Sequence, residues 1–252
     1  MLMHYGNKRT VAGGALLVAV ATAACVPWRA GDTARTPGDV RVLMVFSGMG
    51  REPWSYAWAH IEGTDWIGMR SEPLYDGCAV LSSVLSQIGA HARAVVVAHS
   101  LGCVQAAMMH TCADRLEAVL LLAPPVASLF AGFGNDLRIL AGRTRVRRVV
   151  GTFECLAPYA VQTPCAACDD IAVANASHSG WALLRDGDNP SALARASACG
   201  GVLSNAAQVE EARYQLRALV AGERATSTHP VAAPLCCVPP QLFGSDMAQF
   251  AS

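Results

Sequence analysis

Short, almost wholly apolar runs alternate with segments of helical character along the middle of the chain. The apolar runs span residues 40–46, 94–97, 116–123 and 171–174, a further strand is expected at 147–152, and a brief extended segment covers 66–69. Helices are expected at 54–61, 76–88 and 208–221, with Asp76 placed to cap the second of them. Continuously apolar strands that alternate with helices predict a doubly wound, mostly parallel sheet with helices on both faces, an α/β fold.

The length of the chain bounds the number of domains. A chain of 252 residues can bury one sizeable core, and lengths up to about 250 residues often remain a single α/β domain. We therefore assign one domain to residues 40–221. Residues 222–252 contain several prolines and cysteines but no hydrophobic period, so we expect a loosely ordered tail there.

The first 25 residues have the layout of an export signal. Lys8 and Arg9 precede the apolar stretch 11–24, which is shorter than the roughly 20 residues of a membrane-spanning helix. Small residues stand directly before Cys25, and this segment resembles a bacterial lipobox, in which the cysteine is lipidated. We expect a membrane-associated lipoprotein facing the periplasm or cell surface, with 26–39 as its linker. Plain secretion, an uncleaved anchor and a cytoplasmic location are the alternatives.

Charge and cysteine content narrow the class of partners. Nineteen basic and nineteen acidic residues cancel, so no basic face for DNA or RNA is expected. Ten cysteines would allow some pairing in an oxidising compartment, while Cys103 and Cys112 are expected to be buried thiols. The spacing of Cys165 and Cys168 suits half a zinc site or a redox pair. Because no second such pair exists, a local disulfide or thiols are favoured, and we expect no metal and no cofactor.

One turn carries the strongest chemical signal. The apolar run 94–97 leads into Ala98-His99-Ser100-Leu101-Gly102 and then into a helical segment of small residues. This strand, sharp turn and helix is the layout of a nucleophile elbow, which exposes a serine hydroxyl above a sheet. Small residues are needed two positions before and after the serine, where strand and helix cross, and Ala98 and Gly102 meet that need. The motif predicts a serine hydrolase with Ser100 as its nucleophile.

A serine nucleophile needs a histidine to take its proton, and in this arrangement the histidine comes last along the chain. His4, His60 and His91 precede the serine, His99 is expected to point away from it, and His110 ends the following helix. Two histidines remain. His178 follows the run 171–174 in a loop where the base belongs, whereas His229 lies in the tail. We predict His178 as the base.

The acid that orients this histidine should leave the preceding strand. Glu154 follows the run 147–152 in a segment that resembles the Gly-Thr-x-Asp-x-x-Val-Pro pattern of many hydrolases, with glutamate in place of aspartate. Asp169 and Asp170 are alternative acids, although they lie at the start of the last strand, its non-catalytic end. Glu154 is the preferred candidate.

An acyl intermediate also needs two fixed N–H donors for its oxyanion, and losing one typically costs about 10² to 10³ in rate. The N–H of Leu101 comes with the elbow. The run 40–46 ends at a glycine-containing loop, in which the N–H of Met49, directly after Gly48, is expected to be the second donor.

These motifs support a resemblance to a known family. Trp54, Trp58 and Trp66, the elbow, and the segment 120–125 resemble the small retinoblastoma-binding-protein-9-type serine hydrolases of the α/β-hydrolase superfamily, over residues 40–180. The resemblance implies the α/β-hydrolase fold, little or no lid, and esterase-like activity on a small-molecule or lipid-like acyl ester.

A second resemblance is to the methyl ester esterases that act on pimeloyl-acyl carrier protein, through the patterns at 46–50 and 98–102. A cluster formed by Arg143, Arg145, Arg147 and Arg148 could then hold an acidic carrier, or else be a solvated charge run before a strand. Carrier protein is cytoplasmic, so a functional export signal would exclude this function. A catalytically silent surface lipoprotein that keeps the fold as a binding module is the non-enzymatic alternative.

Overall fold

Six parallel strands form a single sheet at the centre of the molecule. The computed structural model describes residues 41–71, 75–89, 92–125, 130–153, 165–183, 203–224 and 226–229. The strands are β1 (Arg41–Phe46), β2 (Thr64–Met69), β3 (Arg93–His99), β4 (Leu116–Leu122), β5 (Arg145–Phe153) and β6 (Asp169–Ser177), in the order β2-β1-β3-β4-β5-β6. All neighbouring pairs run parallel, which confirms the predicted doubly wound α/β sheet.

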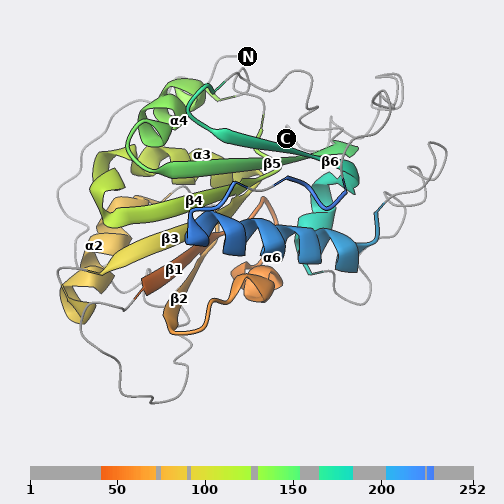
Figure 1. Cartoon of the computed structure of the whole chain (residues 1–252). Helices are drawn as coiled ribbons and strands as arrows, with labels where there is room; N and C mark the ends of the chain where they lie inside the picture. Colours follow the sequence, from red (N-terminus) through yellow and green to blue (C-terminus); the bar gives the residue numbers. More distant parts are fainter. Residues whose placement is uncertain are drawn as a thin grey trace.

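Helices cover both faces of the sheet (Figure 1). The helices α2 (Gly77–Ile88), α3 (Leu101–Met108) and α4 (Phe133–Ala141) pack on one face with the 3₁₀ segment η2 (Met109–Arg115). The long helix α6 (Asn205–Ala221) crosses the other face beside the 3₁₀ segments η1 (Pro53–Ala59) and η5 (His178–Trp181). The helix expected at 54–61 is therefore the 3₁₀ segment η1.

The alternation of side chains along each strand builds two separate cores. In β1, Met44 and Phe46 face the α2–α4 side, whereas Leu43 and Val45 face α6. All of these side chains are fully buried, because a parallel sheet with helices on both faces leaves no strand face to solvent. The strand signal in the sequence was continuous rather than alternating for this reason.

The order of the strands creates a switch point. From β1 the chain moves outward to β2 and then returns to the opposite side of β1 as β3. Loops that leave β1 and β3 at their carboxyl ends therefore diverge, and such a switch point is where doubly wound sheets bind ligands. These are the loop 47–50 and the turn at Ser100.

Two disulfides lie on the described part of the chain. Cys78 in α2 is bonded to Cys112 in η2, and Cys165 is bonded to Cys168 ahead of β6. The expectation of a buried thiol was wrong for Cys112, because its helix end lies against α2, which supplies the partner. Cys103 is a buried thiol whose Sγ donates to the carbonyl of Ala98 at 3.4 Å.

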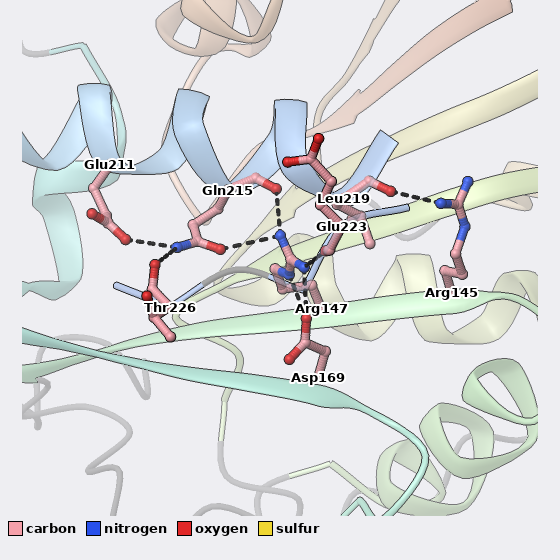
Figure 2. A network of polar contacts seen from close by, with 8 residues as sticks. All are labelled: Arg145, Arg147, Asp169, Glu211, Gln215, Leu219, Glu223 and Thr226. Atoms are coloured by element: carbon pink, nitrogen blue, oxygen red, sulfur yellow. Dashed lines mark hydrogen bonds and ion pairs between the residues drawn. The ribbon is translucent and has the colours of Figure 1, made fainter. Parts of the chain in front are cut away.

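A buried polar network ties α6 to β5 and β6 (Figure 2). Arg147 of β5 is 1% exposed, and its guanidinium donates to the Asp169 carboxylate at 2.7 Å. It also donates to the carbonyl and side chain of Gln215 in α6, at 2.9 and 3.2 Å, and to the carbonyl of Glu223 at 2.7 Å. Arg148 is 3% exposed and forms an ion pair with Asp170. For Arg147 and Arg148, both expectations, a solvated charge run and a surface that binds an acidic carrier, are therefore wrong.

The first residues of the expected tail contact the domain. Glu211, buried on α6, accepts a hydrogen bond from the N–H of Thr228 at 2.9 Å, and the Ala174 N–H of β6 donates to the carbonyl of His229 at 2.9 Å. Residues 1–40, with the expected export signal, Cys25 and the expected linker, and residues 230–252 lie outside the described part of the chain. Among the described helices, none is both long and apolar enough to cross a membrane.

Candidate active site

Ser100 lies on a strained turn between β3 and α3. Its φ of 52° and ψ of −121° belong to a region that non-glycine residues rarely adopt and that costs about 1 to 3 kcal/mol. The turn is held from both sides: the Ser100 N–H donates to the carbonyl of Leu122 at 3.0 Å, and its carbonyl accepts from the N–H of Cys103 at 2.9 Å. A strained backbone kept by such contacts is what a nucleophile elbow requires.

Gly102 allows α3 to start directly against the neighbouring loop. A Cβ at this position would lie 2.5 Å from the carbonyl oxygen of Phe46 and 2.7 Å from that of Ser47. Both obstacles are backbone atoms, so a side chain here would have to move β1 or α3. The glycine thus keeps Ser100 next to the loop 47–50.

His178 is in hydrogen-bond contact with the serine. It follows β6 directly, and its Nε2 lies 2.9 Å from Ser100 Oγ. This distance is within the range for proton transfer between a nucleophile and a base. His229, the alternative base, lies instead beside Ala174, where its carbonyl accepts from the backbone of β6.

Several polar side chains hold the backbone around His178. The contacts are Ser177 N–H to Gln208 Oε1 at 3.1 Å, Asn205 Nδ2 to the Gly180 carbonyl at 2.8 Å, and Trp58 Nε1 to the Trp181 carbonyl at 2.9 Å. They reach η5 from α6 on one side and from η1 on the other. The position of the histidine is therefore set by two elements that are distant in the sequence.

The loop after β1 approaches the serine from the other side. A Cβ on Gly48 would lie 3.3 Å from Ser100 Cβ, and the Gly48 carbonyl accepts from the N–H of Arg51 at 3.0 Å. The next residue, Met49, exposes 55% of its surface. Within the described residues, neither the Met49 N–H nor the Leu101 N–H donates a hydrogen bond. Both predicted oxyanion donors thus have their N–H groups unengaged in this part of the chain.

His99 occupies a position that sequence reasoning missed. It is 3% exposed, its Nδ1 lies 2.6 Å from the Tyr56 hydroxyl, and its Nε2 lies 2.8 Å from the carbonyl oxygen of His178. The rings of His99 and His178 are 5.1 Å apart, so the expectation that His99 points away from the site was wrong. In β3 it shares a face with Val95 and Val97, the face on which η1 and η5 pack.

Burial keeps the Tyr56 and His99 side chains neutral. Removal from water lowers the pKa of His99 to about 3, with a further contribution from the nearby His178. Burial likewise raises the pKa of the Tyr56 phenol above its usual value. Neither group carries a charge at neutral pH.

The preferred acid, Glu154, lies outside the described residues. β5 ends at Phe153, which is paired in register with Ser177, the residue before His178. The alternative acids Asp169 and Asp170 are at the opposite end of β6, where they pair with arginines of β5. At about 3.3 Å per residue, the strand separates them from His178 by more than 20 Å. The structure does not bring these carboxylates to the histidine.

The described residues contain no cluster of three or more His, Cys, Asp or Glu side chains that could hold a metal ion. The arrangement presents a serine hydroxyl, a histidine in contact with it, and backbone N–H groups beside both.

Comparison with known proteins establishes the fold. No family model and no curated protein matches the chain. Among solved structures, a protein of unknown function from Agrobacterium tumefaciens, described as an α/β hydrolase, aligns with a TM-score of 0.52 at 10% identity, over 79% of this chain and 98% of that one. The sheet and its helices thus form an α/β-hydrolase fold.

Two further structures align less closely. Est1E from Butyrivibrio proteoclasticus has a TM-score of 0.43 at 11% identity, over 56% of this chain and 81% of its own. The esterase domain of a Rhodothermus marinus protein has a TM-score of 0.42 at 12% identity, over 66% and 87%. Such alignments add nothing to the fold assignment, and the narrower family resemblances remain expectations from the sequence.

Proposed function

We propose that the protein is a serine hydrolase that cleaves carboxylic ester or thioester bonds through an acyl-enzyme. The contact of 2.9 Å between Ser100 Oγ and His178 Nε2, on a turn with a positive φ, is the observation that carries the proposal. A serine hydroxyl is a weak nucleophile until a base takes its proton, and this contact supplies the base. If the turn were only structural, another residue could adopt its backbone conformation at lower cost. The strained serine therefore favours a functional role.

The reaction proceeds in two halves. Ser100 Oγ attacks the carbonyl carbon of the substrate while its proton passes to His178 Nε2. The N–H groups of Met49 and Leu101 stabilise the oxyanion, and the leaving alcohol or thiol takes the proton from His178 as its bond to carbon breaks. Water, deprotonated by the same histidine, then attacks the acyl-enzyme and releases the acid and the free serine.

Glu154 is the acid in this proposal. It follows Phe153, whose register partner Ser177 directly precedes His178, so the chain leaves β5 beside the base. A carboxylate at that point would accept from His178 Nδ1–H and stabilise the imidazolium that forms during attack.

The substrate is an acyl ester of small-molecule or lipid-like type. The carrier-protein alternative loses support because two of the four arginines that would bind an acidic partner are buried and paired with Asp169 and Asp170. The other alternative is a catalytically silent binding module, and labelling with a fluorophosphonate probe distinguishes it from an active hydrolase.

We also propose that the protein is exported and anchored through a lipid on Cys25. Disulfides persist in oxidising compartments, and the described chain carries two of them. Fractionation of cells tests this: the protein should be found with membranes, and Cys25→Ser should release it. Recovery of both forms from the cytoplasm would contradict the proposal.

Labelling by a fluorophosphonate probe tests the enzymatic function. The wild-type protein should be labelled and should hydrolyse a p-nitrophenyl ester, whereas Ser100→Ala should lose roughly 10⁴ or more in rate. His178→Ala should be about as damaging, and the double variant no worse, because residues acting as one unit are not additive. His229→Ala is the matched control and should remain active. Equal labelling of wild type and Ser100→Ala would exclude the proposal, and no labelling of either would favour the binding module.

The same assay distinguishes the acids. Glu154→Gln should keep the fold and lose about 10² to 10⁴ in rate, because an amide holds the wrong histidine tautomer. Asp170→Asn, at the far end of β6, should cost little activity. An inactive Asp170→Asn beside a fully active Glu154→Gln would show that the acid is misassigned.

A further inference from the structure

We infer that Tyr56 and His99 form a positioning relay that joins the loop 47–50 to the backbone of His178. The relay runs from the Gly48 N–H to the Tyr56 hydroxyl at 3.3 Å, from that hydroxyl to His99 Nδ1 at 2.6 Å, and from His99 Nε2 to the His178 carbonyl at 2.8 Å. The inference rests on the proposed function, because it assigns these residues a role in holding its base and oxyanion donors.

Only one arrangement of hydrogens satisfies the whole chain of contacts. The His178 carbonyl can only accept, so His99 Nε2 carries the proton and donates it. The Nδ1 of a neutral imidazole then has no proton and must accept from the Tyr56 hydroxyl. The hydroxyl oxygen in turn accepts from the Gly48 N–H. The pKa of about 3 for His99 agrees with this neutral form.

The relay sets two parts of the site at once. At one end, it fixes the carbonyl of His178 while Gln208 fixes the preceding N–H of Ser177, so the base is held on both sides. At the other end, it engages the Gly48 N–H, and the N–H of the next residue, Met49, is the one that remains for the oxyanion. Since a displacement of about 1 Å can cost 10²-fold in rate, this coupling should affect catalysis more than folding.

The neutrality of His99 matters for the reaction itself. His178 becomes an imidazolium when it takes the serine proton, and the ring of His99 is 5.1 Å from it. A second charged histidine at that distance would oppose the transfer. A histidine that is buried and already bonded at both nitrogens places a rigid donor there without a charge.

Space around the relay is as tight as its hydrogen bonding. A Cβ on Gly48 would lie 2.6 Å from His99 Nδ1, so the loop and the ring are in direct contact. A shift of the His99 ring therefore moves the loop 47–50 as well as the His178 carbonyl. Gly48, His99 and the carbonyl of His178 are therefore expected to move together.

A pair of substitutions at His99 separates positioning from simple packing. The amide nitrogen of Gln can occupy the place of Nε2 and donate to the His178 carbonyl, whereas Asn reaches only the place of Nδ1. We expect His99→Asn and Tyr56→Phe to reduce kcat for p-nitrophenyl acetate and the rate of fluorophosphonate labelling by about 10- to 10²-fold, with KM changed less than about threefold. His99→Gln loses the contact with Tyr56 but keeps the two ends of the relay, at the His178 carbonyl and at the Gly48 N–H, so it should stay within about fivefold of wild type. Tyr214→Phe, on the exposed side of α6, is the matched control and should be unchanged.

Thermal unfolding of the same variants gives the necessary comparison. If His99→Gln and His99→Asn lose activity equally, or if activity follows Tm across the set, the residues only fill space and the relay is wrong. Nitrogen-15 NMR of histidine-labelled protein tests the hydrogen-bond arrangement without any activity: His99 should be the Nε2–H tautomer at pH 7. An Nδ1–H or charged His99 would overturn the relay even in an active enzyme. Absence of labelling in wild type, with the expected tautomer, would instead count against the proposed function alone.

Discussion

At the scale of single residues, the site depends on the lack of a side chain at Gly102 as much as on the backbone contacts of Ser100. Ser100 adopts its positive φ because Leu122 and Cys103 hold its backbone, and Gly102 lets α3 begin where a side chain would meet two carbonyl oxygens. Helix propensity alone would favour alanine over glycine in α3 by about 1 kcal/mol. The packing requirement outweighs this preference.

Gly102→Ala should therefore destabilise the protein. Overpacking against backbone costs about 1 to 3 kcal/mol, against a gain in propensity of about 1 kcal/mol, so a net loss of up to about 2 kcal/mol is expected. Gly142→Ala is the control, because its φ is −74° and the nearest atoms to a Cβ there are 3.5 Å away. It should be neutral or gain up to about 1 kcal/mol. Urea unfolding of both variants measures the difference, and equal stability would show that α3 can shift freely.

The sequence predicts the serine and the histidine more readily than the residues that hold them. A local motif predicts Ser100. The order of residues along the chain predicts His178, since the base is expected after the last strand. The Tyr56–His99 contact joins residues from η1 and β3, and its far end is a backbone carbonyl. No spacing in the sequence records such a contact, although the face that His99 shares with Val95 and Val97 points to it once η1 is placed there.

At the scale of elements, apolar periodicity locates the strands but not their full extent. The run 171–174 marks only the middle of β6, which starts at Asp169 and ends at Ser177. Likewise β5 begins at Arg145, two residues before the strand expected at 147–152. The polar start of β6 belongs to the strand because Asp169 and Asp170 pair across the sheet with Arg147 and Arg148 of β5. Charged pairs between neighbouring strands have no hydrophobic period, so the pattern could not extend the strands to their true ends.

Arg147, which is buried and bonded to α6 as well as to β6, should matter more for stability than the exposed Arg145. Arg147→Met would leave the Gln215 side chain and the carbonyls of Gln215 and Glu223 without their donor, at a cost of about 2 to 4 kcal/mol (Figure 2). Arg145→Met is the matched control, because that side chain is 44% exposed and should cost under about 1 kcal/mol. Urea unfolding compares the two. Similar losses would mean that the network contributes no more than a surface contact.

At the scale of the whole molecule, four segments converge at the switch point of the sheet. The loop after β1, the turn after β3, η1 and η5 meet there, and α6 holds the last of them through Gln208 and Asn205. The α/β class and the place of the serine in it follow from the sequence, because each depends on neighbours along the chain. The support that α6 gives to the backbone around His178 depends on tertiary packing. In the sequence, Gln208 and Asn205 look like ordinary polar residues on a helix surface.

The buried histidine at this point should make the stability of the whole molecule depend on pH. His99 has a folded pKa of about 3, below the ordinary value of about 6.5 that applies in the unfolded chain. Between these values the unfolded state binds a proton that the folded state does not. The contribution of His99 is thus complete above about pH 6.5 and is lost as pH falls, at up to about 1.4 kcal/mol per pH unit.

His99→Gln removes this titration and leaves the other groups in place. Urea unfolding at pH 7, 6 and 5 should show the wild-type protein losing stability faster than the variant, so that the gap between them changes by about 1 to 2 kcal/mol over this range. Parallel curves for the two proteins would mean that His99 takes up a proton without leaving its buried site.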